Sequence, residues 1–162
     1  MSSGIFVNFS TFKGGSTNMS YRDQFEATRV AWGVDVPFAL SSGGSPTPGK
    51  STPRAIELKL AYQVGFTDIG LASAKGTVIP TINIELVAPG GGVAPRKILR
   101  YDLTSTFITS FGLADDTGVG DDLLTVTLAP SKVVWSQFIY SAAGSLTSTK
   151  TATFDFKLNT FS

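Results

Sequence analysis

The stretch IELKLAYQVGFTDIGLASAKGTVIPTINIEL, residues 56–86, contains the patterns that decide the fold class. Apolar side chains occupy every second position from Ile56 to Tyr62 and again from Ile82 to Leu86. A period of two with branched and aromatic residues is typical of half-buried antiparallel strands. The stretch therefore predicts two strands joined by a segment of a different kind.

The joining segment predicts the only helix that we expect in the chain. Phe66, Ile69 and Leu71 are its apolar residues, Thr67 or Asp68 could cap its start, and Gly76 could end it. The segment is short and contains Gly70. We expect a single helical element between two strands.

The rest of the chain repeats the strand pattern. Residues 5–9, 24–36 and 152–158 alternate in the same way, and turn-rich segments separate the strands. This spacing is that of a β-sandwich or β-barrel and differs from βαβ units. We expect one all-β domain over residues 1–162. Between Gln24 and Val36 the pattern places two sets on opposite faces: Glu26, Thr28, Val30, Trp32, Val34 and Val36 against Phe25, Ala27, Arg29 and Ala31.

The composition excludes several classes of function. The chain has no cysteine and no histidine, so disulfides, thiolate chemistry and the commonest general base and metal ligand are absent. The formal net charge is +1, which gives no electrostatic reason to expect nucleic acid or an anionic membrane as a partner. MSSGIFVNFS, residues 1–10, has neither a basic region nor a long apolar run, and no stretch reaches the roughly 20 apolar residues of a membrane span. We expect a chain made in the cytoplasm without a cleaved signal peptide.

The fraction of charged residues is low. It is 15%, against about 25% in ordinary globular domains, and Ser and Thr supply much of the polarity. One interpretation is a β protein with uncharged polar faces. The other is that part of the weakly charged surface is buried against further copies of the chain.

One motif suggests a nucleotide site. GGSPTPGKST, residues 43–52, matches the phosphate-binding pattern G-x-x-x-x-G-K-[ST]. A phosphate cradle needs consecutive backbone N–H donors and a helix directly after them. Pro46 and Pro48 have no N–H, and the next residues, AIELKL, alternate as a strand. We interpret the match as a coincidence in a Gly/Ser/Pro loop. The nucleotide hydrolase alternative predicts nucleotide binding that depends on Lys50.

A second cluster suggests calcium. DDTGVGDD, residues 115–122, gathers four carboxylates, but its spacing is not that of an EF-hand loop. The alternative is a solvated hairpin turn. No pair of carboxylates stands out for acid–base catalysis, and Trp32 and Trp135 suit a core or an interface better than a ligand platform. We therefore expect no enzyme, no metal and no cofactor.

Eight segments in order resemble one protein family, and together they cover nearly the whole chain. They are IFVNF (5–9), FKGGSTN (12–18), RVAWGVDVP (29–37), SSGGSPTPGK (41–50), the strand–helix–strand stretch 56–86, KILRYDLTSTFITSF (97–111), DDLLTVTLAPSKVVWSQF (121–138) and TFDFKLNTF (153–161). The order is similar to that in Hcp, the haemolysin-coregulated tube protein of bacterial type VI secretion systems. The chain lacks the Glu-rich, His-bearing stretches common in that family, which leaves the subfamily open.

The resemblance implies a two-sheet antiparallel β-barrel with one short α-helix on its side. It also implies homohexameric rings that stack into the inner tube of a contractile machine, with a sheath, a spike protein and small effector proteins as partners. Neither nucleic acid nor membrane insertion is implied. The protein itself would be exported, into the medium or a target cell. The chain stops at its last strand, so we expect no fused toxin domain.

The long connection between Phe38 and Pro53 is the candidate functional segment. A connection of this length is unusual in a compact β domain, and in the resembling family a loop at this position reaches toward the adjacent ring. We expect it to contact the next ring through Ser41, Ser42, Gly43, Gly44, Ser45, Pro46, Thr47, Pro48, Gly49 and Lys50.

Two rivals remain open at this point. A phage-type tail tube protein would share the barrel and the ring. A monomeric ligand-binding β-sandwich would be a 17 kDa monomer with a row of exposed aromatic side chains.

Overall fold

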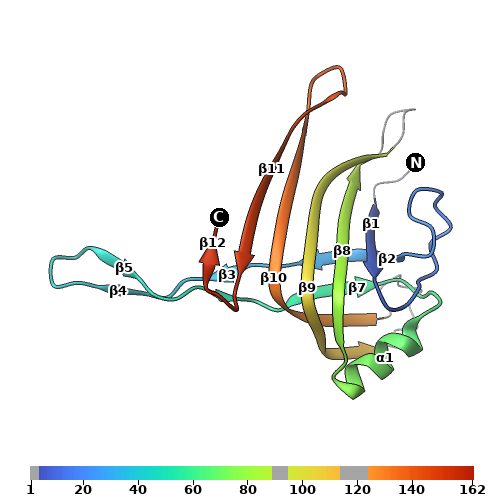
Figure 1. Cartoon of the computed structure of the whole chain (residues 1–162), viewed down its shortest axis with the longest axis horizontal. Coiled ribbons are helices and arrows are strands. Elements are labelled where there is room, and N and C mark those ends of the chain that lie inside the picture. The colour runs from blue at the N-terminus through green and yellow to red at the C-terminus, as the bar shows by residue number, and fades with distance from the viewer. Residues whose placement is uncertain (1–3, 89–94, 114–123) are drawn as a thin grey trace.

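The computed structural model describes residues 4–88, 95–113 and 124–162. One eight-stranded antiparallel sheet dominates the molecule (Figure 1). Its strands are β1 (Gly4–Phe9), β2 (Phe25–Ala31), β7 (Ile56–Leu60), β8 (Val78–Ala88), β9 (Arg96–Leu113), β10 (Leu124–Tyr140), β11 (Leu146–Asp155) and β12 (Thr160–Phe161). The predicted all-β class is confirmed.

Six of these strands form a closed circuit of pairings, in the order β1–β2–β7–β10–β9–β8 and back to β1. The circuit closes because β9 and β10 are long, at 18 and 17 residues. The first part of β10 pairs with β7 and its second part with β11, while β9 pairs along both parts. The family resemblance implies a barrel of two sheets, whereas in the structure these strands are hydrogen-bonded into one sheet.

The core lies inside this circuit and draws on every strand of it. Alternation along β7 is complete, since Ile56, Leu58 and Leu60 are buried and the residues between them are half-exposed. The fully or almost fully buried apolar side chains of this core are Val7, Phe9, Phe25, Ile56, Leu58, Leu60, Ile69, Ile79, Ile82, Ile84, Leu103, Ile108, Leu124, Val126, Leu128 and Val133. We call the six strands and the helix that packs on them the body of the molecule.

The predicted helix is α1 (Phe66–Lys75), and it buries Ile69 and Ala72. Gly76 ends it in the left-handed conformation, with φ 63°, as the sequence predicts. Its start differs from the prediction. Gly65, with φ 101°, occupies the N-cap position without a side-chain cap, and Asp68 instead lies in the first turn, where a carboxylate favours the helix dipole.

The predicted faces of residues 24–36 are wrong beyond Thr28. The register between β2 and β7 shifts between Ala27 and Arg29, which marks a bulge at Thr28. Phe25 is buried and Ala27 packs on the core before the bulge, whereas Val30 and Trp32 pack on it afterwards. One extra residue moves all later side chains to the opposite face.

The C-terminal strand also differs from its prediction. β11 ends at Asp155 and residues 156–159 turn, so Leu158 lies outside the strand and is exposed. β12 then returns to pair with the end of β11. Phe154 and Phe156 pack against the core, but residues 152–156 are all half-buried, so the predicted alternation does not appear in their burial.

Gln63 fixes the body to the segment before β2 through its side-chain amide. Its Oε1 accepts hydrogen bonds from the backbone N–H of Gly15 and Glu26, at 3.3 and 2.9 Å. Its Nε2 donates to the carbonyl oxygens of Glu26 and Ala61, both at 2.8 Å. The amide thus replaces a peptide unit between two strands. Within the described residues no helix is long and apolar enough to cross a membrane.

Two hairpins leave the body in different directions (Figure 1). The connected ends of β10 and β11 form a hairpin that extends upward in this view. A thin arm formed by residues 34–53 extends to the left. Helix α1 lies at the other end of the long axis. The arm contains the predicted functional segment.

Candidate functional site

The arm is a paired β-hairpin rather than an irregular loop. At its base β3 (Val34–Asp35) pairs with β6 (Thr52–Pro53), and toward its tip β4 (Phe38–Leu40) pairs with β5 (Pro46–Pro48). All of the residues from Pro37 to Lys50 are exposed. The backbone therefore has a defined course, although no side chain of the tip is buried in the body.

Backbone hydrogen bonds join the two strands of the arm at positions other than Pro46 and Pro48, which have no N–H to donate. The Gly49 N–H donates to the Pro37 carbonyl at 2.6 Å. At the tip the Ser41 N–H donates to the Ser45 carbonyl at 3.0 Å, and Gly44, with φ 79°, provides the turn. The arm is ordered locally by a sparse ladder and a tight turn.

An ion pair closes the base of the arm. The Arg54 Nε and Nη2 donate to Asp35 Oδ2 and Oδ1, at 2.8 and 2.7 Å, and the Arg54 N–H donates to the Gly33 carbonyl at 2.9 Å. The hydrogen bonds from Arg54 lower the pKa of the Asp35 carboxyl below its ordinary value. A bidentate pair fixes orientation as well as distance, so it sets the direction in which the arm leaves the body.

One face of the arm is apolar. Val36, Phe38 and Leu40 alternate along the first strand and are 47%, 69% and 68% exposed. Phe38 pairs with Pro48 and Leu40 pairs with Pro46, so the two prolines share that face. Residues 36–49 contain no charged side chain. An uncharged apolar strip on a projecting hairpin is suited to bind another protein surface.

The structure places all ten predicted contact residues on this arm. Ser41, Ser42, Gly43, Gly44 and Ser45 form the turn, Pro46, Thr47 and Pro48 form β5, and Gly49 and Lys50 follow it. Sequence reasoning missed the apolar face and the Asp35–Arg54 pair. The V-x-F-x-L alternation of residues 36–40 is the signal that could have revealed the face.

The nucleotide interpretation lacks its structural context. Residues 43–52 form a hairpin turn, β5 and the start of β6, and the next element is the strand β7. The helix that would direct its N-terminus at a phosphate does not follow. Lys50 is exposed on the arm.

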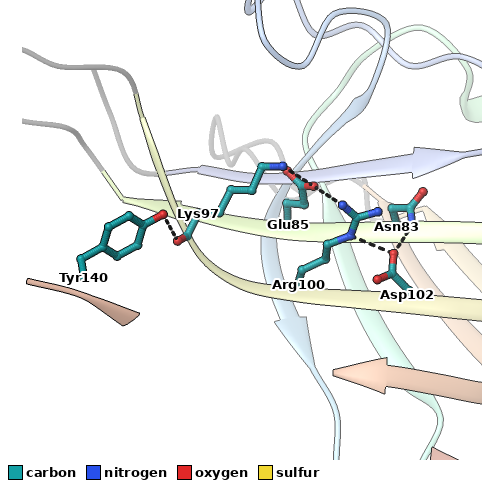
Figure 2. A network of polar contacts seen from close by, with 6 residues as sticks. All are labelled: Asn83, Glu85, Lys97, Arg100, Asp102 and Tyr140. Atoms are coloured by element: carbon teal, nitrogen blue, oxygen red, sulfur yellow. Dashed lines mark hydrogen bonds and ion pairs between the residues drawn. The ribbon is translucent and has the colours of Figure 1, made fainter. Parts of the chain in front are cut away.

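A polar network lies on the outer face of β8 and β9 (Figure 2). Glu85, 8% exposed, accepts ion pairs at Oε1 from Lys97 Nζ and Arg100 Nη1, both at 3.3 Å. The Arg100 Nε donates to Asp102 Oδ1 at 2.8 Å, and Asn83 Nδ2 donates to the same oxygen. Figure 2 shows these side chains converging between the two strands.

Residues from outside the two strands enclose this network. The Tyr140 hydroxyl donates to the Lys97 carbonyl at 2.9 Å. Tyr21 stacks on Phe6 at 4.2 Å between ring centroids, and burial together with the neighbouring Glu85 carboxylate raises the pKa of Tyr21. Both carboxylates of the network are bound by cations, which is typical of a structural ion-pair network.

No metal-binding cluster occurs among residues 4–88, 95–113 and 124–162. The calcium interpretation concerns residues 115–122, which lie outside the described residues.

One aromatic cluster consists of Trp32, Tyr101, Trp135 and Phe154. Trp32 makes edge contacts with Tyr101, Trp135 and Phe154, at 5.9, 6.5 and 5.2 Å between ring centroids. Tyr101 and Trp135 stack, and burial raises the pKa of Tyr101. Trp32 is partly buried and packs against the core, while Trp135 is 38% exposed beside a cavity of about 120 Å³ lined also by Gln137 and Lys150.

Comparisons with known proteins agree on one family. The sequence model of the family described as "Type VI secretion system effector, Hcp" matches residues 6–157. No match was found among curated protein sequences. A solved structure described as a type six secretion system protein is 18% identical, with a TM-score of 0.89 over 99% of this chain and 100% of the other.

Two further solved structures have the same fold. Hcp1 from Salmonella typhimurium is 19% identical, with a TM-score of 0.78 over the whole of both chains. A type VI secretion system effector from Yersinia pestis is 14% identical, with a TM-score of 0.69 over 93% of this chain and 98% of the other. At these identities the structures establish the fold, and the family model establishes the family.

Proposed function

The chain belongs to the Hcp family and is a type VI secretion tube or effector protein, and from this premise we propose that it forms homohexameric rings which stack into the inner tube. Residues 1–162 act as one tube domain. The observation that carries the proposal is the projecting arm of residues 34–53, whose exposed face is apolar and uncharged. Such a face is stabilised when a further copy covers it.

The arm makes its contacts between rings more than within one ring. Its residues Ser41 to Lys50 extend away from the body, where the neighbours within the circuit of strands do not reach them (Figure 1). The Asp35–Arg54 pair directs the arm, and the sparse ladder lets the tip adapt to the surface it meets.

Further partners follow from the family. We propose that the tube runs inside a contractile sheath, carries a spike protein at its end, and holds small effector proteins in its lumen. The protein is made in the bacterial cytoplasm and exported without a cleaved signal peptide. The Hcp family is structural and secreted, which suggests a non-enzymatic role, and we propose that this chain has no catalytic activity and needs no cofactor.

The native mass tests the ring. Sedimentation of the purified protein is expected to give a six-fold multiple of 17.1 kDa. A monomer at every concentration would contradict the ring and would favour a monomeric ligand-binding β-sandwich.

Shortening the arm tests stacking. Replacing residues 41–51 by a short Gly-Ser linker is expected to leave the body folded and the ring intact, because the strands of the circuit keep their pairing. Tube formation, seen by electron microscopy, and secretion are expected to fall sharply. Shortened rings that stack as readily as the wild type, or a shortening that breaks the ring, would exclude the proposed role of the arm.

A further inference from the structure

Residues 17–22, between β1 and β2, are attached to the outer face of the sheet through one side chain, and we call them the lid. Tyr21 is 5% exposed, whereas the other five residues of the lid are exposed or half-exposed. The Tyr21 ring stacks on Phe6 of β1, at 4.2 Å between ring centroids. The position of the lid therefore depends on how firmly Tyr21 is held.

The site that holds Tyr21 is separate from the core of the body. Phe6, Tyr21 and Val87 form a small buried cluster of their own. Phe6 pairs with Glu85 across β1 and β8, so both face outward, while Ile84 beside Glu85 faces the core. Tyr21 can therefore leave its site without opening a cavity in the core.

Glu85 provides the second contact of Tyr21. Its Oε1 accepts the ion pairs from Lys97 and Arg100, both at 3.3 Å (Figure 2). Its Oε2 is buried, and no group of the described residues forms a hydrogen bond with it. Burial and the neighbouring Glu85 carboxylate raise the pKa of Tyr21, so its hydroxyl keeps a proton that it can donate to that carboxylate.

The base of the lid is fixed at both ends. Ser16 is 3% exposed, its N–H donates to the Gln24 carbonyl at 2.9 Å, and its carbonyl accepts the Asp23 N–H at 3.0 Å. Asp23 has φ 61°, in the left-handed region that Asn and Asp adopt more readily than most residues. A paired base next to a residue of unusual backbone conformation is a suitable place for a local rotation of the lid.

The lid keeps its own shape and packs incompletely on the residues next to it. Within it the Tyr21 N–H donates to the Asn18 carbonyl, and the Ser20 N–H donates to Asn18 Oδ1, both at 3.0 Å. A cavity of about 430 Å³ borders it, lined among others by Met19 of the lid and Gly14 before its base. A segment with internal bonds and few buried contacts can move as one unit.

From these contacts we propose that the lid opens at the Ser16–Asp23 base, with Tyr21 as its latch, while the body stays folded. In the closed state Tyr21 covers Phe6 and Val87. In the open state these two side chains and Glu85 become accessible on the outer face. Exposing apolar surface costs free energy, so the closed state predominates. The lid thus decides whether this part of the outer face is covered or presents an apolar and acidic surface, and it does so without dependence on the ring or the tube.

Thiol labelling tests the lid, because the chain has no cysteine of its own. Val87→Cys places the probe in the cluster under the lid, and Ile84→Cys is the matched control on the same strand, 0% exposed in the core. Both would be prepared in the native background, with Tyr21→Phe and with Tyr21→Ala. The labelling rate of each would be measured in buffer and in low concentrations of urea.

V87C is expected to react about ten-fold faster than I84C or more, because it needs only the local opening. Tyr21→Phe should accelerate labelling of V87C several-fold and Tyr21→Ala more strongly, with little change for I84C. Low concentrations of urea should accelerate I84C more than V87C, since unfolding of the body exposes more surface than opening of the lid.

Equal rates for V87C and I84C throughout the urea series would overturn the lid, because both probes would then react only through unfolding of the body. Fast labelling of V87C that neither Tyr21 variant changes would overturn Tyr21 as the latch. Acceleration by Tyr21→Ala alone would support the stack on Phe6 and overturn the part of the Glu85 contact.

Trypsin cleavage after Arg22 gives a readout that needs no cysteine. Arg22 lies in the lid and is exposed, but a protease needs several residues of free backbone around its target bond. Cleavage there should be faster in Tyr21→Ala than in the native chain, with the body left intact. An unchanged rate of cleavage would overturn the latch.

Discussion

The body and the arm of this molecule differ in what stabilises them: the body buries its apolar side chains, and the arm exposes them. In the body, six strands close a circuit around buried side chains such as Phe25 and Leu58, and burial of apolar surface stabilises it. In the arm, Phe38 and Leu40 are exposed, and only a sparse ladder and the Asp35–Arg54 pair order the backbone. The same residue types thus stabilise the fold in one region and remain available for a partner in the other.

Removing one phenylalanine from each region is expected to give the largest contrast. Phe25 is 0% exposed and contacts Phe9 and Phe12 edge-on, at 5.2 and 6.0 Å between ring centroids. Phe25→Ala is expected to lower the free energy of unfolding by about 3–5 kcal/mol. Phe38→Ala is expected to change it by less than about 0.5 kcal/mol, because the side chain is already in water.

Urea denaturation of both variants, with electron microscopy of Phe38→Ala, measures this contrast. Phe38→Ala should fold like the wild type and fail to build tubes. A loss of more than about 1 kcal/mol in the free energy of unfolding of Phe38→Ala would mean that the arm packs on the body.

A second comparison lies within the body, between two glycines with positive φ that differ in how closely other atoms surround them. Gly65 has φ 101°, and a Cβ there would lie 2.5 Å from both the Lys13 carbonyl oxygen and the Phe25 ring. Gly76 has φ 63° and nothing within 4 Å. Gly65→Ala is expected to cost about 2–4 kcal/mol, from backbone strain and overpacking together, and Gly76→Ala about 1–2 kcal/mol, from strain alone.

Thermal and urea unfolding of the two glycine variants, compared with the wild type, test this difference. Equal losses in both would show that the close contacts of Gly65 relax without cost. In that case the junction between α1 and the strands of the body would be looser than its distances indicate.

The sequence predicts the strands of the body because their alternation directly reflects burial. Residues 56–60 show this clearly, since every apolar side chain there is buried. The prediction fails at Thr28 because a bulge is a property of the pairing between two strands, and the residues 27–29 carry no local signal for it. The N-cap of α1 is missed for a similar reason: Gly65 is placed by its contact with Lys13 and Phe25.

The sequence predicts where the candidate site lies in the chain, but it does not predict that the segment forms a β-hairpin. The length and composition of residues 38–53 identify the segment, while its Gly and Pro content favours a loop over a hairpin. The prolines of β5 are tolerated because the hairpin is exposed on both edges. The burial of Glu85 also depends on Tyr21, which comes from a distant segment, in addition to Lys97 and Arg100 on the neighbouring strand β9.

The smallest expected effect concerns the base of the arm. The hydrogen bonds from Arg54 hold the pKa of Asp35 below its ordinary value of 3.8. A carboxyl with a lowered folded-state pKa stabilises the folded arm above the unfolded value, and this contribution disappears as the pH falls through the folded value. Because both side chains are exposed, Asp35→Asn is expected to leave the global unfolding midpoint almost unchanged.

Amide hydrogen exchange at the arm reports this effect directly. The Arg54 N–H, bonded to the Gly33 carbonyl, and the Gly49 N–H, bonded to Pro37, are the two reporters. At neutral pH both amides should exchange several-fold faster in Asp35→Asn than in the wild type. As the pH falls below 3.8 the wild type should approach the variant, and Arg54→Lys, which keeps the charge but loses the bidentate geometry, should lie between them. Protection in Asp35→Asn equal to that of the wild type at neutral pH would show that the ladder alone orders the arm, and that the ion pair has no part in directing it.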